Sequence, residues 1–286
     1  MNQAKSLTVS IVIPVYNEAD QLVACLQAIA AQTVRPLEVI VVDNNSNDSS
    51  STVAESFGFV KIVREQRQGV VHARDRGFDA ASGDIIGRID ADTRLSPDWV
   101  EAIQQLFVDE SLAAVSGSVD YHDLPRRDIN AKLDLFFRRR IASGMEGEVF
   151  LYGANMAVRR SVWQAVRTEV CHDAGLHEDF DLAIHTQALG FRAKFDRRLK
   201  ASVSLRRFDS QLVELWPYLW QSPRTYARHG LKSQRNMYPV IVLVIAFYVP
   251  LKLLHRGYNA ETGQFSLRQA VSPSSQVRVN PALFID

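Results

Sequence analysis

Two carboxylates stand one residue apart, at Asp90 and Asp92, directly after the apolar run IIGRI. A pair of carboxylates on one turn can share a divalent cation. Hard cations such as Mg²⁺ and Mn²⁺ prefer oxygen ligands and accept substrate phosphates into their coordination shell. Acidic pairs are also common at solvated turns, so the spacing alone carries little weight. The position of this pair at the end of a buried strand favours a metal site.

A third carboxylate, Asp43, ends the apolar run LEVIVVD and precedes the amide-rich segment NNSND. Such a carboxylate can accept a hydrogen bond from a nucleobase ring N–H or from ribose hydroxyls. The alternative is an Asx turn or a helix cap, and Asp48 fits that alternative better than Asp43 does. Tyr16, which follows the first apolar run, either offers an aromatic face to a base or packs half-buried against its neighbours.

These residues must be positioned by the elements around them, which alternate regularly over residues 7–120. β-Branched runs predict strands, and amphipathic spacing predicts helices. Strands are expected at 9–14, 37–42, 60–63, 84–89 and 113–119, and helices at 19–31, 49–57, 71–81 and 97–107. This alternation is typical of an α/β fold with a mostly parallel sheet and helices on both faces. Since ligands bind beyond the carboxyl ends of such strands, we expect Tyr16, Asp43, Asp90 and Asp92 to share one edge.

Composition excludes several other classes of protein. The 286 residues include 33 basic and 32 acidic side chains, for a net charge of +1, which argues against a nucleic-acid partner. The sequence has no GxGxxG after the first strand, no GxxxxGK[ST] and no GxSxG, the motifs of dinucleotide dehydrogenases, P-loop enzymes and serine hydrolases. Two distant cysteines and a polar N-terminus predict a reducing, cytoplasmic compartment.

The C-terminal part is less regular. A short strand or turn is expected at 152–158, a helix at 177–189, and aromatic and basic side chains gather at 207–235. Residues 236–251 carry no charge but fall short of the ~20 apolar residues that span a bilayer. Their basic flanks suit an element at a membrane interface, whereas a buried core element fits the same pattern. We predict a catalytic domain at 1–205 and a helical, apolar extension at 206–286 that could contact a membrane or an acceptor.

Five segments in order along the chain carry a family resemblance. They read SIVIPVYNEADQL, VIVVDNNSNDSS, GVVHARDRGFDAASGDIIGRIDADT, YGANMAVRRSVW and HEDFDLAIHTQALGF. Together they resemble family 2 of the inverting nucleotide-sugar glycosyltransferases, whose GT-A fold is a Rossmann-like, mixed, mostly parallel sheet with helices on both faces. The resemblance covers about residues 7–200.

The resemblance implies a donor site. The residues matching the family's nucleotide-contacting positions are Pro14, Tyr16, Asn17, Glu18, Asp43, Arg74 and Asp90. Among them, Asp43 matches the carboxylate that holds the base, usually uracil. Asp90 and Asp92 match the DxD motif that binds the metal, Mg²⁺ or Mn²⁺, on the donor diphosphate.

The resemblance also implies an acceptor side. Gly153 and Asn155 match the segment that borders the sugar and the acceptor. Glu178 and Asp179 match the family's ED pair, in which the aspartate deprotonates the acceptor hydroxyl. An acidic first turn of a helix, favoured by the helix dipole, is the structural alternative for this pair.

Two departures from the family pattern stand out. Gln221 and Arg224 resemble the family's QxxR element, which normally continues with Trp. Here Thr225 follows, which argues against a processive polymer synthase. The second departure is Asp75, where the family more often has Asn.

The function implied is an inverting, metal-dependent glycosyltransferase of the hexosyltransferase type. Its donor would be a nucleoside-diphosphate sugar, with UDP-sugars foremost, and its acceptor a hydroxyl on a glycan or a lipid-linked intermediate of cell-envelope polysaccharide or glycolipid synthesis. Peripheral membrane contact through residues 236–256 would place it at the inner face of the cell membrane. Two alternatives remain: a sugar-nucleotidyltransferase, which the missing Gly-rich, Lys-bearing loop after the first strand disfavours, and a catalytically silent nucleotide-sugar-binding module.

Overall fold

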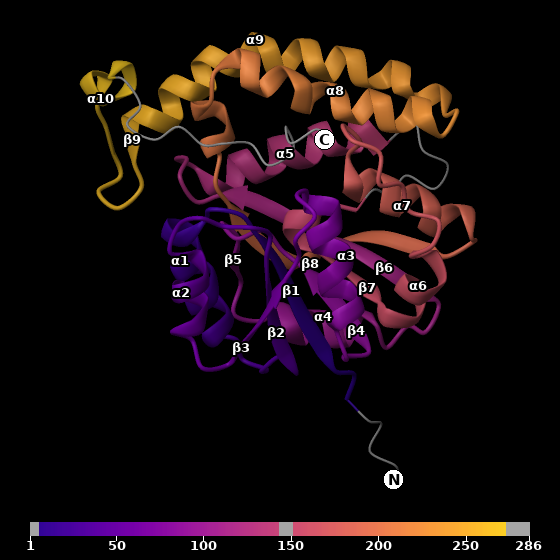
Figure 1. The fold of residues 1–286 in the computed structure, drawn as a ribbon. Coiled ribbons are helices and arrows are strands. Elements are labelled where there is room, and N and C mark those ends of the chain that lie inside the picture. Colours follow the sequence, from indigo (N-terminus) through magenta and orange to yellow (C-terminus); the bar gives the residue numbers. More distant parts are fainter. Residues whose placement is uncertain (1–5, 143–150, 273–286) are drawn as a thin grey trace. The chain divides into compact units, whose positions relative to one another are not determined.

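The computed structural model describes residues 6–142 and 151–272. The chain divides into two compact units, each assembled from separate segments (Figure 1). The first comprises Met1–Ser118, Val149–His172 and Glu178–Ala201, and the second Val119–Glu148, Asp173–His177 and Ser202–Asp286. The division of the chain at residue 205 stays a prediction.

An eight-stranded sheet forms the centre of the first unit, with the strand order β3-β2-β1-β4-β7-β6-β8-β5. β1 pairs in parallel with β2 and β4, and β2 with β3, whereas β7 runs antiparallel to β4 and β6. The mixed, mostly parallel α/β fold is therefore confirmed. The strands are β1 (Val9–Val15), β2 (Glu38–Asp43), β3 (Val60–Arg64), β4 (Ile85–Arg88), β5 (Arg94–Leu95), β6 (Leu112–Tyr121), β7 (Met156–Arg159) and β8 (Arg192–Val203).

The register of the parallel strands places their carboxyl ends together. Val15 at the end of β1 stands beside Asp43 at the end of β2, and Val12 stands beside Arg88 at the end of β4. The strand order reverses at β1, since β2 and β4 flank it on opposite sides, and such a switch point is where ligands bind in open α/β sheets. The segments that follow β1, β2 and β4 therefore begin at the same edge of the sheet, as predicted for Tyr16, Asp43, Asp90 and Asp92.

The helices of the first unit bury the faces that the sequence predicts. They are α1 (Ala19–Ala30), α2 (Ser50–Glu55), α3 (Val70–Ala80), α4 (Trp99–Leu106), α6 (Arg160–Val166) and α7 (Glu178–Ala188), with a 3₁₀ turn at Gly153–Asn155. On α1 the apolar stripe includes Leu22, Leu26 and Ile29, all fully buried. α3 approaches the sheet at Gly77, where a Cβ would meet Val12 and Val42. α1 is thus held by its apolar stripe, and its N-terminus has no side-chain cap.

Like the two-residue β5, β8 is a strand that local patterning does not predict. Its sequence, RAKFDRRLKASV, alternates in burial only near its end, where Leu199, Ala201 and Val203 are buried. Charged side chains occupy most of the remaining positions and hide the period of two on which strand prediction rests.

The second unit is mainly helical. Its elements are α5 (Arg127–Ala142), a 3₁₀ turn at Arg206–Asp209, α8 (Leu212–Arg228), a 3₁₀ turn at Lys232–Asn236, α9 (Met237–Gly257), β9 (Tyr258–Asn259), β10 (Gln264–Phe265) and α10 (Leu267–Val271). The apolar stretch predicted from sequence lies on α9, which confirms an apolar helical extension. The helical stretch Gln234–Gly257 spans 24 residues and is long and apolar enough to cross a membrane, by length and composition only.

α9 is not a buried core helix, which was one of the two interpretations of the uncharged stretch. Only 17% of its 18-residue apolar window is buried. Exposed apolar side chains include Val242, Phe247 and Val249, each more than half exposed. A core helix buries its apolar stripe, so this exposure does not fit the core interpretation.

A cluster of charged side chains fixes the C-terminal end of α9 within the second unit. Nε2 of His255 lies 3.0 Å from Oδ2 of Asp123, and Nδ1 lies 3.0 Å from Oδ2 of Asp209. Arg256 Nε donates to Oδ1 of Asp209 at 3.0 Å. Burial alone would lower the pKa of His255, but the two carboxylates outweigh it and raise that pKa to about 9. His255 is therefore a doubly paired cation at neutral pH.

Candidate functional site

The site begins at the turn after β4, which carries Asp90 and Asp92. The turn is closed by a hydrogen bond from the Thr93 amide to the Asp90 carbonyl at 3.0 Å. The Asp90 side chain is 40% exposed and Asp92 is half-buried, so both carboxylates reach the polar edge of the sheet. Beneath them, burial and then the charges of Asp92 and Asp90 raise the pKa of the Cys25 thiol. The thiol also donates to the Asp90 carbonyl, with Sγ 3.8 Å from the oxygen.

Arg88 joins this turn to the acidic start of α7. Its side chain is 3% exposed, and Nη2 lies 3.1 Å from Oδ1 of Asp90 and 3.1 Å from Oε1 of Glu178. Nη1 lies 3.6 Å from Oδ1 of Asp179. Burial alone would lower the pKa of Arg88, but the attraction of Asp90, Asp179 and Glu178 outweighs it and raises the pKa. One buried guanidinium thus draws together two acidic motifs that lie far apart in the sequence.

Asp179 is held by the backbone of the 3₁₀ turn at Gly153–Asn155. The carboxylate is 3% exposed, and its Oδ2 accepts from the Gly153 amide at 2.8 Å. A Cβ at residue 153 would overlap Nη1 of Arg88 and stand 2.6 Å from Oδ1 of Asp179. Residue 153 must therefore be glycine for the carboxylate, the guanidinium and the backbone to approach one another.

Arg74 supports the same acidic pair from α3. Its side chain is fully buried, and Nη1 donates to the backbone carbonyl of Glu178 at 2.7 Å. Its Nε donates to Oδ1 of Asp75 at 2.8 Å. Asp75 in turn lies 2.7 Å from Nε2 of His172, whose ring stacks on His72 at 5.4 Å between centroids. The carboxylate at position 75 therefore has two partners, the Arg74 guanidinium and the His172 ring.

The edge after β1 and β2 is built from turns that close on Asp43. Oδ1 of Asp43 accepts from the Ser46 amide at 2.9 Å, and Oδ2 accepts from the Ser51 hydroxyl at 2.8 Å. Asp43 therefore forms the Asx turn. Because each carboxylate oxygen has two lone pairs, Asp43 can still accept a further hydrogen bond. Asp48 accepts from the amides of Ala19 and Ser50, as expected for a cap.

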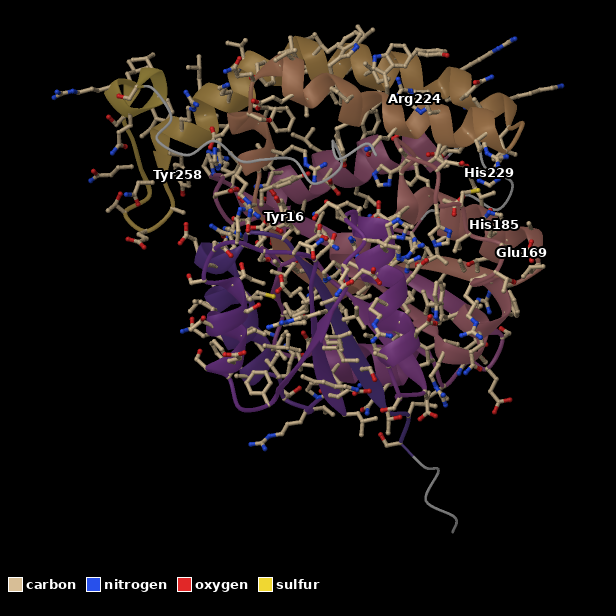
Figure 2. The ribbon with its side chains drawn as sticks, viewed as in Figure 1. Tyr16, Glu169, His185, Arg224, His229 and Tyr258 are labelled. Atoms are coloured by element: carbon tan, nitrogen blue, oxygen red, sulfur yellow. The ribbon has the colours of Figure 1, made fainter. Side chains whose placement is uncertain are left out.

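The first loop of this edge is tied to the second. Asn17 adopts φ +53° and accepts from the Asn47 amide at 2.8 Å, while the Glu18 amide donates to the Ser50 hydroxyl at 2.8 Å. Pro14 and Tyr16 at the end of β1 are half-buried (Figure 2 labels Tyr16). The four residues predicted for one nucleotide-contacting loop, together with Asp43, thus lie along one edge.

Asn44 is a residue of this edge that sequence patterns miss. Its Oδ1 accepts from the Gly69 amide at 2.8 Å, and its Nδ2 donates to the carbonyls of Glu65 and Arg67 at 2.9 and 2.7 Å. It therefore fixes the loop that enters α3. The only local signal is its place directly after the strand-ending Asp43.

Asn155, predicted to border sugar and acceptor, is fully buried, and its amide is engaged within the protein. Its Oδ1 accepts from Trp99 Nε1 at 2.8 Å, and its Nδ2 donates to the carbonyls of Ser118 and Leu199 at 2.8 and 3.0 Å. This geometry favours positioning of the Gly153 turn over direct contact with a sugar.

Gln221 and Arg224 lie on α8 and belong to the second unit, whereas the residues above belong to the first. Gln221 is buried and its carbonyl accepts from the Thr225 hydroxyl at 2.8 Å, whereas Arg224 is exposed (Figure 2). Thr225 also accepts from the His177 amide at 2.8 Å. The hydroxyl at position 225 therefore ties α8 to the segment that leads into α7, a role that Trp cannot fill.

In the first unit the arrangement offers two kinds of chemistry side by side. Asp90 and Asp92 form a half-exposed oxygen donor set that fits a hard divalent cation bound to phosphates. Asp179 is a buried carboxylate beside the Arg88 cation, and a carboxylate is a residue type that can act as a general base. Between them, Arg88 balances part of the negative charge.

Comparison with known proteins gives the site its context. Residues 10–167 match the family model described as Glycosyl transferase family 2, which is more than half of the chain. The putative glycosyltransferase EpsH of Bacillus subtilis (strain 168) is 28% identical over 248 residues, 79% of this chain and 71% of EpsH. The matched stretch spans only 36% and 54% of two further glycosyltransferases, from Escherichia coli and Haloferax volcanii.

Solved structures share the fold. The mannosyltransferase PcManGT from Pyrobaculum calidifontis, in complex with GDP-Man and Mn²⁺, aligns with a TM-score of 0.62 at 21% identity, over 93% of this chain and 74% of its own. Glucosyl-3-phosphoglycerate synthase from Mycobacterium tuberculosis, with Mn²⁺, UDP and glucosyl-3-phosphoglycerate, aligns with a TM-score of 0.55 at 21% identity, over 79% and 81% of the two chains.

Proposed function

Because the chain belongs to glycosyl transferase family 2, we propose that it transfers a sugar, with inversion, from a nucleoside-diphosphate sugar to an acceptor hydroxyl. The observation that carries the proposal is the Arg88 cluster. It places the predicted metal-binding Asp90 and the predicted base Asp179 within reach of one guanidinium. A donor diphosphate bound through a metal at Asp90 and an acceptor hydroxyl at Asp179 would therefore lie close to each other.

A UDP-sugar is the donor that we propose. The Asp43 carboxylate is placed to accept a hydrogen bond from a base N–H or a ribose hydroxyl. The loop that carries Tyr16 and Asn17 borders it. The structural neighbours support a nucleotide-sugar donor, since one is described with UDP and another with GDP-Man.

Asp90 and Asp92 are the residues that would hold Mg²⁺ or Mn²⁺. When bound, the cation supplies Lewis-acid neutralisation of charge on the leaving diphosphate. Arg88 adds a fixed positive charge behind Asp90, oriented by its own burial. Such preorganised charge costs no reorganisation during the reaction.

Asp179 would take the proton of the acceptor hydroxyl at its carboxylate. The Gly153 amide fixes Oδ2, and Arg88 lies nearest Oδ1, so the carboxylate cannot rotate without losing a partner. Arg74 holds the Glu178 backbone at the start of the same helix turn. Glu178 shares Arg88 with Asp90 and thereby keeps the guanidinium centred. These residues would position the base beside the acceptor hydroxyl, whose oxygen attacks the anomeric carbon from the side opposite the leaving diphosphate, as inversion requires.

The acceptor that we propose is a glycan or lipid-linked hydroxyl in cell-envelope polysaccharide or glycolipid synthesis. The support is α9, which exposes apolar side chains between the basic residues Arg235 and Lys252. An apolar helix with basic flanks suits peripheral contact with an anionic membrane. The inner face of the cell membrane is the corresponding location.

A panel of UDP-, GDP- and dTDP-sugars tests the function. Each is scored for thermal stabilisation with and without Mn²⁺ and for the product released. Release of a nucleoside diphosphate, with an inverted anomeric centre in the product by NMR, supports the proposal. Release of pyrophosphate from a sugar phosphate and an NTP would instead identify a nucleotidyltransferase, and no turnover with any donor would identify a binding module.

Co-sedimentation with anionic liposomes tests the membrane contact separately. The wild type should sediment, and Val242→Ser/Phe247→Ser/Val249→Ser on the exposed face of α9 should not. A wild type that stays in the supernatant at low salt refutes the contact without touching the assignment of the reaction.

A further inference from the structure

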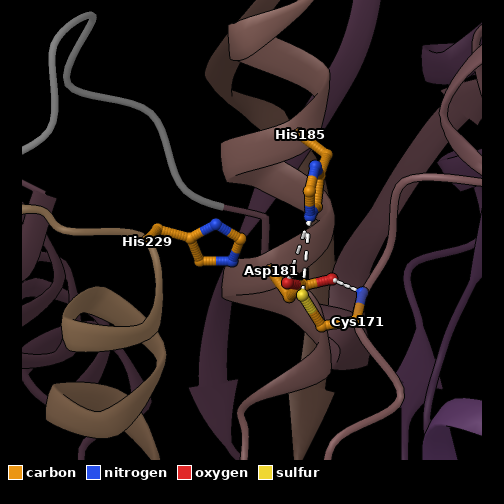
Figure 3. A group of neighbouring side chains, drawn as sticks. All are labelled: Cys171, Asp181, His185 and His229. Atoms are coloured by element: carbon orange, nitrogen blue, oxygen red, sulfur yellow. Dashed lines mark hydrogen bonds and ion pairs between the residues drawn. The ribbon is translucent and has the colours of Figure 1, made fainter.

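Three side chains of different chemistry converge at α7, outside the Arg88 cluster. Figure 3 shows Cys171, Asp181 and His185 turned toward one another. Sγ of Cys171 lies 3.8 Å from Nε2 of His185, and Oδ1 of Asp181 lies 3.4 Å from the same nitrogen. The three donor atoms all lie within 4.8 Å of one another. All three residues belong to the first unit, whereas His229, also drawn in Figure 3, belongs to the second.

These separations are those of ligands around one tetrahedral ion. With Zn–S of about 2.3 Å and Zn–N and Zn–O of about 2.0–2.2 Å, tetrahedral angles separate sulfur from nitrogen by about 3.6 Å and oxygen from nitrogen by about 3.3–3.5 Å. The separations of 3.8 Å and 3.4 Å between the donor atoms are close to these edges. A hydrogen bond between a ring N–H and a carboxylate would instead bring the atoms to about 2.7–3.2 Å.

The ligands are oriented by the surrounding structure. Asp181 is fully buried, and its Oδ2 accepts from the Cys171 backbone amide at 2.8 Å, which leaves Oδ1 facing His185. Asp181 and His185 stand one turn apart on α7, so their side chains lie on the same face. Cys171 and His185 are half-buried, which leaves an approach from solvent.

We infer that Cys171, Asp181 and His185 bind a Zn²⁺ ion through Sγ, Oδ1 and Nε2. Binding releases the Cys171 proton to solvent, because the thiolate is the ligand. Thiolate and imidazole select zinc over the hard cations that suit Asp90 and Asp92, so the two sites take different metals.

Zinc bound here would fasten the segment before α7 to the helix that carries the acidic pair. Cys171 precedes Glu178 and Asp179 in the chain, while Asp181 and His185 follow them on the helix. A cross-link between these two stretches restrains the first turn of α7. The site is therefore structural, and its loss should show in stability before it shows in the chemistry of Asp179.

Cobalt replaces zinc as a spectroscopic probe of the metal-stripped full-length protein. The wild type with one equivalent of Co²⁺ should show the visible bands of a tetrahedral ion and a near-ultraviolet sulfur-to-cobalt charge-transfer band, and Zn²⁺ should abolish both. Cys171→Ser should lose the charge-transfer band, and His185→Gln should lose the tetrahedral spectrum. Zn²⁺ should raise the melting temperature of the wild type and leave that of either variant unchanged.

Two matched variants separate this site from the other candidates. Cys25→Ala removes the second cysteine, and Asp92→Ala removes a ligand of the proposed catalytic metal, so both should keep the cobalt spectrum and the Zn²⁺ stabilisation. Circular dichroism of each variant verifies folding. A wild type without the charge-transfer band, or a Cys171→Ser variant that keeps it, would overturn the site.

Discussion

Gly153 lies so close to Arg88 that a Cβ on residue 153 would overlap the guanidinium nitrogen Nη1. The same backbone donates to the carboxylate of Asp179 at 2.8 Å. Any side chain at this position must therefore displace the cation that the acidic residues share. Replacing Gly153 by alanine therefore tests the whole Arg88 cluster.

Gly153→Ala should lower transfer by about 10²-fold or more, because a displacement of about 1 Å near the reacting groups has that effect. Steady-state rates with the preferred donor measure it. Gly58→Ala is the matched control, since a Cβ there meets nothing within 4 Å. Equal transfer rates for Gly153→Ala and Gly58→Ala would show that transfer does not depend on the present position of the Arg88 guanidinium.

Arg88→Met should destabilise the protein by about 3–5 kcal/mol, since it leaves buried carboxylates without their cation. Arg88→Lys keeps the charge but lacks the planar fork, so it should retain more stability than Arg88→Met and still lose activity. Urea unfolding measures both. The exposed Arg94→Met should stay within about 0.5 kcal/mol of the wild type. If Arg88→Met unfolds like Arg94→Met, the cluster contributes nothing to folding.

Asp179→Asn should reduce transfer by about 10²–10⁴-fold while donor binding persists, because the amide keeps the shape but cannot accept the acceptor proton. Product formation and calorimetry with the nucleotide report the two quantities separately. The exposed Glu169→Gln serves as control (Figure 2). Near-full activity of the Asn variant would exclude Asp179 as the base.

Asp92→Ala should weaken the metal-dependent part of nucleotide binding. The comparison is calorimetry of UDP with Mn²⁺ and with a chelator, for this variant and for the exposed Glu110→Ala. Binding that loses its metal dependence only in Asp92→Ala is the expected result. An unchanged metal dependence would remove the carboxylate from the metal site.

His255 should make the stability of the second unit depend on pH. Its folded pKa of about 9 lies above the unfolded value of about 6.5, so its contribution is fully present below pH ~6.5 and is lost as pH rises through 9. The contribution is on the order of 3 kcal/mol at most. Asp123 and Asp209 have lowered pKa values, because the bonds from His255 outweigh burial, so their contribution is lost only at acid pH.

Denaturant midpoints at pH 6 and pH 10 measure this dependence. The wild type should lose stability between them, and His255→Gln, which cannot be protonated, should lose less. Parallel profiles for the two proteins would exclude the imidazolium as the source.

Much of the first unit could be predicted because its signals are local. The spacing of Leu22, Leu26 and Ile29 defines the buried face of α1. Asp43 at the end of β2 and Asp90 shortly after β4 mark one edge of the sheet. β8 could not be predicted, because arginines and lysines interrupt its alternation and its partner strands lie far away in the chain.

The site was predictable where motifs are contiguous and not where contacts are distant. Asp90, Asp92 and Asp179 are marked by their neighbours in sequence, whereas Arg88 acquires its role only when α7 packs beside β4. Its one local sign is a charge inside an apolar strand, a placement that requires partners. Asn44 likewise acts through carbonyls of a loop that is remote in sequence.

The antiparallel pairing of β4 with β7 has a consequence for folding during synthesis, because β7 comes much later in the chain. Ile85 has no partner on that side until Arg159 has emerged, and the intervening residues include the whole of β6. A nascent chain that pauses after Ser118 presents a bare, apolar sheet edge, the kind that recruits other chains. Glu178 and Asp179 are synthesised later still. They can therefore join Asp90 around Arg88 only when the first unit is nearly complete.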